Sequence, residues 1–399
     1  MQEPKQPLTA PHVDTTGAPS MTRDCLDPWT YLEVSARGDL RPCCHFSQLA
    51  TLRKEVPDVA LVRDNEGFRA LRQSLLSGNL HQRCQSCHIR KMVPTEVLKR
   101  RLAAARSQAC TTDVLAPLPI TEFRIDITTK CNLRCDYCSV SAPSYHGVEM
   151  TDAVFERIVP LLGDIDPAAA VYVNGHGETT YHPEWMRMCR NLIDSGFRPL
   201  ITTNLAKVYS DEELDLLSRF ARIEVSLDSG DNELMRTIRK AVRVEHIFET
   251  IQRIRDVAAS QGQQPPDFGF SIGIYDPSIW SLEAFVDRII RVGVTNVTFW
   301  DLVEKPHQTL VKALHRLDTE QQRSARRILA KTRRKLDLAG IQHQFAGDFH
   351  AMIFEPTWTD RLRMVLGRAY AAASRHSLRA VFRRALSIRR TTSASIPRS

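Results

Sequence analysis

Lys130-Cys131-Asn132-Leu133-Arg134-Cys135-Asp136-Tyr137-Cys138-Ser139 places three cysteines in one short, loop-like run. Their C-x3-C-x2-C spacing suits three corners of a cubane 4Fe–4S cluster and leaves the fourth iron without a protein ligand. A closed zinc site needs four ligands, usually as two separated pairs, and the nearest downstream histidine, His146, lies outside such a pairing. An odd local set of cysteines does not pair off as disulfides. The run therefore favours an iron–sulfur cluster with one open iron, with zinc as the alternative.

This run, with the aromatic Tyr137 directly before the third cysteine, resembles the cluster loop of the radical S-adenosylmethionine (radical SAM) superfamily. In that superfamily the loop follows the first strand of a partial (βα)6 barrel. The resemblance implies that Cys131, Cys135 and Cys138 bind a 4Fe–4S cluster. It also implies that S-adenosylmethionine (SAM) binds the open iron, with Tyr137 among the residues that contact the cofactor.

Composition is that of an ordinary soluble globular protein. The chain has 399 residues, 43% hydrophobic and 25% charged, which suffices for a large core and a smaller module. Residues 1–20 are rich in Pro and Thr without an apolar run, so we expect a disordered leader and neither a signal peptide nor a membrane anchor. The ten cysteines are then those of a cytoplasmic protein, where metal binding is commoner than disulfide formation.

The net charge of +8 is concentrated at the C-terminus. Between Asp360 and Ser399, ten arginines against one aspartate give +9, which leaves −1 for residues 1–359. We expect a basic, helical extension over 346–399, which either packs on the barrel or contacts an anionic membrane surface or a partner protein. The rest of the chain has no basic stripe with interleaved aromatics, which argues against nucleic-acid binding.

Strand-like and helix-like segments alternate from residue 118 onward. The expected strands cover 120–128, 169–174, 198–203, 221–227, 268–275 and 295–300. The expected helices cover 152–162, 183–195, 211–220, 232–260, 281–292 and 320–338. Six such units predict an α/β fold, a partial (βα)6 TIM-like barrel over 118–345. In parallel barrels, functional groups gather at the C-terminal ends of the strands.

The ends of the second, third and fourth strands carry the next motifs. Asn174-Gly175-His176-Gly177-Glu178-Thr179 resembles the superfamily's glycine-glycine-glutamate motif, although His176 separates the glycines and Thr179 stands where proline is common. Singly, the polar residues at the other two strand ends are ordinary turn or cap formers. The resemblance implies that these three strand ends contact the amino group, ribose and carboxylate of SAM through Gly175, Gly177, Glu178, Thr203, Asn204, Ser226 and Asp228.

A second set of cysteines precedes the barrel: Cys25, Cys43, Cys84 and Cys87. A hairpin around Gly38 and a helix over 67–76 would bring these four thiols together. The run resembles the SPASM or twitch auxiliary-cluster domain, which implies a second 4Fe–4S cluster, although such a domain usually follows the barrel. Tetrahedral zinc is the alternative. Cys43, which follows a proline, is favoured over Cys44. We expect this metal domain over 21–95 and a linker over 96–117.

The resemblance implies an enzyme. An electron from a donor such as flavodoxin or ferredoxin would reach the cluster, SAM would be cleaved, and a 5′-deoxyadenosyl radical would abstract hydrogen from the substrate. Tyr275, Asp276 and Asp301, at the ends of the fifth and sixth strands, are candidate proton acceptors.

Three functions stay open at this point. The first is oxidation or epimerisation of a small molecule, such as a sugar or cyclitol of a natural-product pathway, because a single auxiliary site resembles the short twitch form. The second is a SPASM-type enzyme that modifies peptides. The third is a non-catalytic, metal-binding scaffold. A fold class does not identify a substrate.

Overall fold

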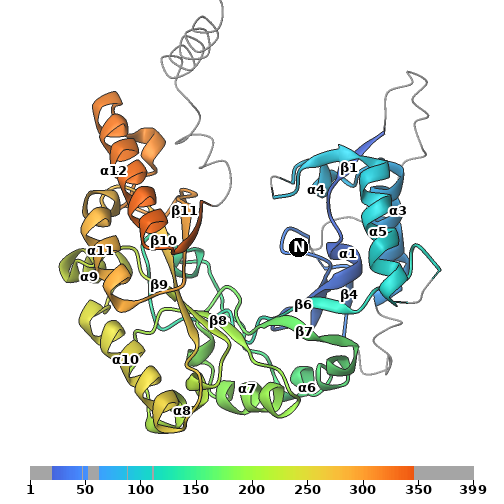
Figure 1. Cartoon of the computed structure of the whole chain (residues 1–399), viewed down its shortest axis with the longest axis horizontal. Helices are drawn as coiled ribbons and strands as arrows, with labels where there is room; N and C mark the ends of the chain where they lie inside the picture. Colours follow the sequence, from blue (N-terminus) through green and yellow to red (C-terminus); the bar gives the residue numbers. More distant parts are fainter. Residues whose placement is uncertain (1–19, 47, 53–62, 88, 110–111, 346–399) are drawn as a thin grey trace, which may run out of the picture. The chain divides into compact units, whose positions relative to one another are not determined.

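The computed structural model describes residues 20–46, 48–52, 63–87, 89–109 and 112–345 (Figure 1). The expected basic extension at 346–399 lies outside these residues, as does all of the expected leader except Ser20. Among the described helices, none is long and apolar enough to cross a membrane.

One ten-stranded sheet has the order β12-β11-β10-β9-β8-β7-β6-β2-β3-β4. Seven of its strands run parallel in chain order: β6 (Ile120–Ile125), β7 (Ile165–Tyr172), β8 (Leu200–Thr203), β9 (Arg222–Ser226), β10 (Asp267–Ile274), β11 (Asn296–Asp301) and β12 (Gln342–Phe345). The predicted α/β fold with six βα units is confirmed. Strand β12 was not predicted, because its sequence Gln-His-Gln-Phe has no apolar run that would indicate a strand.

Helices follow each of the first six parallel strands: α6 (Asp152–Phe155), α7 (Trp185–Asp194), α8 (Asp211–Ser218), α9 (Asn232–Arg239), α10 (Val244–Ser260), α11 (Leu282–Val292) and α12 (Thr319–Leu338). The helix expected over 232–260 is two helices, because Lys240 and Ala241 adopt positive φ angles of 58° and 45°. The helix expected over 152–162 ends early and gives way to a 3₁₀ segment, Val159–Asp164, with Pro160 in its first turn.

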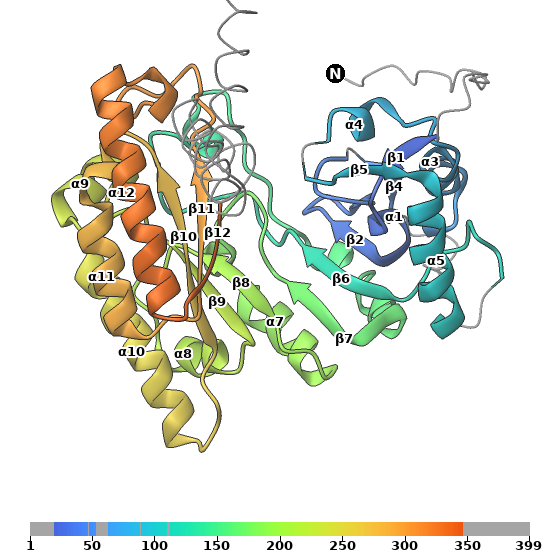
Figure 2. The same cartoon turned by 45° about the horizontal axis from the view of Figure 1, so that its top comes forward.

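Alternate residues of β10 show which face of the sheet the helices cover. The ring of Phe270 lies 6.0 Å from Phe248 of α10 and 5.7 Å from Phe285 of α11. Gly269 and Ser271, its neighbours along the strand, therefore point to the opposite face. Figure 2 shows α10, α11 and α12 running along one side of β9, β10 and β11.

The N-terminal segment joins this same sheet. It forms α1 (Asp27–Thr30), β2 (Tyr31–Val34), β3 (Asp39–Arg41), β4 (Ala50–Thr51), α3 (Glu66–Ser77), α4 (Gln82–Gln85) and α5 (Thr95–Ala109), and a separate two-stranded sheet of β1 (Met21–Arg23) and β5 (Met92–Pro94). Strand β2 pairs in parallel with β6, while β3 and β4 add antiparallel strands at the edge. Strand pairing therefore connects the cysteine-rich segment directly to the barrel strands.

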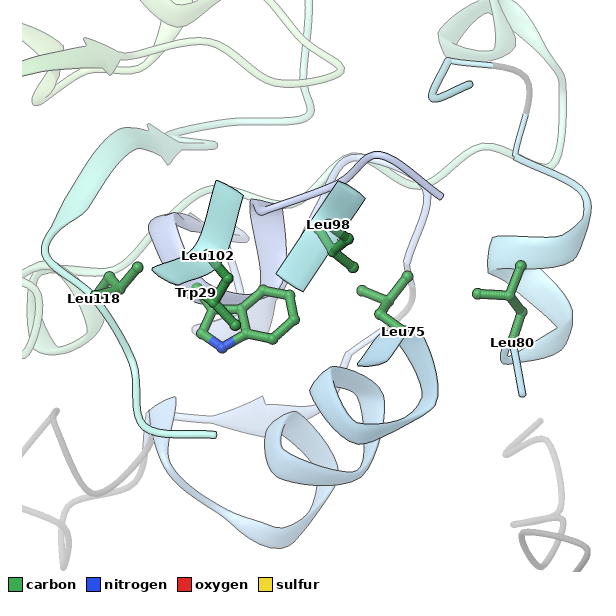
Figure 3. Close-up of a cluster of buried hydrophobic side chains, with 6 residues drawn as sticks. All are labelled: Trp29, Leu75, Leu80, Leu98, Leu102 and Leu118. Atoms are coloured by element: carbon green, nitrogen blue, oxygen red, sulfur yellow. The ribbon is translucent and has the colours of Figure 1, made fainter. Parts of the chain in front are cut away.

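Residues 96–117, expected as a linker, begin with helix α5 instead. Leu98 and Leu102 lie four residues apart on one side of this helix and are buried against Trp29 and α3. Figure 3 shows the resulting cluster of Trp29, Leu75, Leu80, Leu98, Leu102 and Leu118. The segment is part of the N-terminal core because its apolar spacing is helical.

Candidate functional site

The three cysteines of the quoted run lie in the loop after β6. Cys131, Cys135 and Cys138 are partly buried and form no disulfide. The Sγ atom of Cys131 accepts the Leu133 N–H at 3.4 Å, and burial raises the pKa of its thiol to about 11. A cluster bound through thiolates needs such N–H donors and a partly buried site, so this donor set fits a 4Fe–4S group held by three cysteines.

The turn after β7 docks on the backbone of this loop. The Gly177 N–H donates to the carbonyl of Thr128 at 3.2 Å, and the Glu178 N–H donates to the carbonyl of Lys130 at 2.8 Å. A Cβ atom on Gly177 would collide with both carbonyl oxygens. A Cβ atom on Gly175 would collide with the side chain of Asp126. The glycines of the motif are therefore required for contact with the loop that precedes Cys131.

Glu178, Thr203 and Asn204, three of the predicted cofactor residues, form one connected group. The Glu178 carboxylate is only 3% exposed and accepts the Thr203 hydroxyl at 2.8 Å and the Asn204 N–H at 2.7 Å. Burial raises the pKa of Glu178, and these donors counteract the rise. The Asn204 side chain donates to Asn132 at 2.8 Å, which ties the group to the cysteine loop.

Asp228 lies at the centre of a buried network at the end of β9. Its carboxylate is fully buried and accepts five hydrogen bonds of 2.6–2.9 Å, from Arg239 (two), Tyr137, Tyr275 and Gly273. The second predicted residue of this strand end, Ser226, accepts Arg239 Nη1 at its backbone carbonyl, at 2.6 Å. The SAM contact of Asp228 stays a prediction, and the network gives the residue an internal role of its own.

The three candidate proton acceptors have different surroundings. Tyr275 is fully buried and donates its hydroxyl to Asp228, which argues against a proton-accepting role. Asp276 is partly buried and accepts the indole N–H of Trp280 at 2.7 Å. Asp301 is partly buried, and burial raises its pKa. Asp276 and Asp301 stay predictions.

Two residues of this site carried no sequence signal. Trp300 of β11 packs its ring 5.2 Å from that of Tyr137, edge-on. Arg239, in the last turn of α9, lies beneath the same tyrosine with its guanidinium 5.7 Å from the ring centre. Both reach the loop from segments more than 100 residues away along the chain. No local sequence pattern therefore predicts their contacts with the loop.

The N-terminal cysteines come from three parts of the segment: Cys25 lies between β1 and α1, Cys43 follows β3, and Cys84 and Cys87 lie in and just after α4. Arg23 of β1 donates from Nε to the Cys84 carbonyl at 2.8 Å, and the Cys87 N–H donates to the same carbonyl at 3.3 Å. Burial raises the pKa of Cys25, and the nearby Asp27 and Cys43 raise it further. Cys43 is partly buried, while Cys44 is exposed. Cys43 therefore has the environment expected of a ligand.

Among the described residues, no three His, Cys, Asp or Glu side chains converge as ligands of a single metal ion. This applies to both sets of cysteines. In a cubane cluster each thiolate binds a different iron atom, so the cysteines of such a site are not required to converge on one point.

Comparison with known proteins identifies the class of fold. Residues 125–261 match the model of the Radical SAM superfamily, a stretch that runs from the end of β6 to just beyond α10 and includes the cysteine loop. Together with the parallel sheet and its order, this match shows that the barrel has the radical SAM α/β fold.

Curated relatives are about a quarter identical to this chain over the parts that align. A tungsten-containing aldehyde ferredoxin oxidoreductase cofactor-modifying protein of Pyrococcus furiosus is 25% identical over 175 residues, 43% of this chain and 48% of the relative. A probable GTP 3′,8-cyclase of Methanothermobacter thermautotrophicus is 25% identical over 204 residues, 47% of this chain and 63% of the relative. The aligned part thus covers less than two thirds of either relative.

Among solved structures, the chain is similar to Streptococcus suis SuiB bound to S-adenosylmethionine. That comparison covers 82% of this chain and 75% of SuiB, with 17% sequence identity and a TM-score of 0.48.

Proposed function

We propose that this chain is a radical SAM enzyme that abstracts hydrogen from a small polar molecule and thereby oxidises or epimerises it. The observation that carries the proposal is the docking of the cysteine loop on the Gly175–Glu178 turn and on the end of β8. When bound, the cluster and SAM supply an organic radical. The residues of the chain bind and orient the reactants and exclude water.

The residues on the sheet face opposite the helices support the proposal that the substrate is polar. On β6 and β7 the Arg124 guanidinium lies 4.3 Å from the centre of the Tyr172 ring and donates to Glu122 at 2.8 Å. On β9, burial raises the pKa of Glu224, which a hydrogen bond from Thr298 of β11 counteracts. Charged and hydroxyl groups on this face suit a substrate rich in hydroxyl or amino groups, such as a sugar or cyclitol.

A second metal centre at Cys25, Cys43, Cys84 and Cys87 is part of the proposal. These four cysteines would hold a SPASM- or twitch-like 4Fe–4S cluster, which would supply an electron acceptor for an oxidised product; zinc is the alternative. The electron for SAM cleavage comes from a flavodoxin- or ferredoxin-like donor. A cytoplasmic location is expected, since such donors and reduced thiols belong to that compartment.

Anaerobic reconstitution with iron and sulfide tests the activity. The chain should release 5′-deoxyadenosine from SAM only when a reductant is present. Cys135→Ala should abolish this release, while Cys189→Ala should retain it, because Cys189 is buried in α7 and belongs to neither set of candidate ligands. A fully loaded chain that does not cleave SAM would refute the radical reaction and favour a scaffold.

Metal analysis of the same protein tests the second centre. About eight iron atoms per chain would support two 4Fe–4S clusters, whereas about four would contradict the second cluster. Four iron atoms with one zinc would indicate the alternative. Incubation of the active enzyme with a panel of sugars, cyclitols and peptides then separates the two substrate classes.

A further inference from the structure

An ion pair is buried beneath the second half of the cysteine loop. Asp228 and Arg239 have side chains that are 0% and 4% exposed, and two parallel hydrogen bonds of 2.8 and 2.9 Å join them. The third guanidinium nitrogen donates to the Ser226 carbonyl at 2.6 Å. Both charges are thus compensated, as burial of an ion pair requires.

Both ends of this pair hold the loop. The Tyr137 hydroxyl donates to Asp228 at 2.8 Å, and the Asp136 N–H donates to the Ile238 carbonyl at 2.8 Å. The Cys135 Sγ atom lies 4.0 Å from the Arg239 carbonyl oxygen, as a weak S–H donor would. The last turn of α9 therefore contacts the loop through backbone and side chain together.

The chain adopts an unfavourable conformation directly after this turn. Lys240 and Ala241 both have positive φ angles, of 58° and 45°, although neither is glycine. Two consecutive residues in this region persist only when surrounding contacts fix them. Here the conformation ends α9 at Arg239 and leaves the carbonyls of Ile238 and Arg239 to face the cysteine loop.

The positive charge of the pair lies beside the cysteine loop. The guanidinium carbon of Arg239 is 5.7 Å from the centre of the Tyr137 ring, and Tyr137 stands between Cys135 and Cys138 in the chain. A guanidinium stays protonated at every working pH. Reduction of an iron–sulfur cluster adds negative charge, so a nearby fixed cation favours the reduced state.

We propose that Arg239 is a positioning residue that holds the cysteine loop and raises the reduction potential of its cluster, with Asp228 limiting that rise. The inference rests on the proposed function, in which Cys131, Cys135 and Cys138 hold the cluster. It assigns to α9 a role in making the cluster easier to reduce by the electron donor.

Redox titration of the reconstituted full-length chain, followed by electron paramagnetic resonance without SAM, tests the inference. A variant with Cys131, Cys135 and Cys138 replaced by alanine identifies the signal of this cluster. We expect Arg239→Gln to lower the ratio of reduced to oxidised cluster at a fixed potential at least tenfold, a shift of about 59 mV for one electron. Asp228→Asn should shift the ratio in the opposite direction. Arg236→Gln, on the exposed side of the same helix, should leave it unchanged.

A double variant distinguishes an effect of charge from an effect of misfolding. Arg239→Gln combined with Asp228→Asn removes both charges and leaves no unpaired ion in the interior. It should lower the potential by less than Arg239→Gln alone. Shifts of the two single variants in the same direction, or a double variant with an unchanged or raised potential, would show a purely structural role and overturn the inference alone. A wild-type chain without a cluster in this loop would overturn the proposed function and the inference with it.

Discussion

At the scale of single residues, the glycine at 177 shows how closely the two halves of the site are packed. Its backbone donates to Thr128, and no side chain fits between the turn and the carbonyls of Thr128 and Lys130. The resemblance to the glycine-glycine-glutamate motif implies that Gly177 contacts SAM. The structure adds a second reason, which is the approach of the cysteine loop itself.

Gly177→Ala should therefore lower the free energy of unfolding by about 1–3 kcal/mol and reduce iron incorporation, because rigid backbone blocks the added methyl group. Thermal unfolding and iron analysis measure both effects. Gly163→Ala is the matched control, since a Cβ atom there meets nothing within 4 Å. Equal behaviour of the two variants would contradict the steric explanation.

Asp126, at the end of β6, is a second residue with a measurable consequence. Its side chain is 6% exposed, and among the described residues Oδ1 has no hydrogen-bond partner. Burial raises the pKa of Asp126 from 3.8 to about 7; Glu33 adds to the rise, while Arg41 and the His176 N–H oppose it. The folded chain thus keeps a proton that the unfolded chain releases.

The proton on Asp126 stabilises the folded chain fully at a pH below the pKa that Asp126 has in the unfolded chain. This stabilisation is lost as the pH rises toward 7. Between about pH 4 and pH 7, Asp126 should lower the free energy of unfolding by up to about 1.4 kcal/mol per pH unit. Urea unfolding of wild type and Asp126→Asn at about pH 5 and pH 7 measures the difference. Wild type should lose stability relative to the variant at the higher pH, and parallel profiles would refute the shifted pKa.

Residues that sequence spacing could identify are those with a local pattern. The C-x3-C-x2-C run, the Gly177–Glu178 pair and the polar ends of β8 and β9 lie in the loop or at the strand ends where they were expected. Asp126, Arg239 and Trp300 acquire their roles only through burial and through contacts across the fold. No spacing along the chain encodes such contacts.

At the scale of elements, helix α5 stabilises the N-terminal segment. Leu98 and Leu102 pack into the cluster with Trp29, so Leu102→Ala should lower the free energy of unfolding by about 2–5 kcal/mol. Denaturant unfolding measures the loss. Leu338→Ala, on a side chain 79% exposed at the end of α12, should change it by less than about 0.5 kcal/mol. Similar losses in both would contradict the packing of α5.

The positions of helices and strands could be predicted where the apolar periodicity is strong. They were harder to predict where the local backbone conformation sets the end of an element. The six predicted barrel strands all exist, because each carries apolar residues either in alternation, as in β6 and β9, or in a short run. The break between α9 and α10 depends on the left-handed backbone of Lys240 and Ala241, which their side chains do not favour. We attribute the left-handed backbone at Lys240 and Ala241 to the tertiary contacts between Arg239 and the cysteine loop.

At the scale of the whole molecule, the continuous sheet makes the N-terminal segment necessary for the barrel strands. Without β2, strand β6 would be an unprotected edge with free backbone groups. A chain that starts at residue 112 should therefore aggregate and lose cooperative thermal unfolding, as size-exclusion chromatography and calorimetry would show. A chain that lacks only residues 1–19 keeps every described strand and should unfold like the full-length protein. A soluble, cooperatively folded 112–399 chain would contradict this dependence.

The parallel pairing of β2 with β6 also bears on the order of events during synthesis. Strands β2, β3 and β4 leave the ribosome before any other strand of the large sheet, and domains commonly begin to fold from the N-terminus as the chain emerges. The hairpin of β2 and β3 is then ready as a template when β6 appears, and the remaining parallel strands can add in chain order. Cys25, Cys43, Cys84 and Cys87 emerge before the barrel does, so under the proposed function metal delivery to these cysteines would precede completion of the barrel.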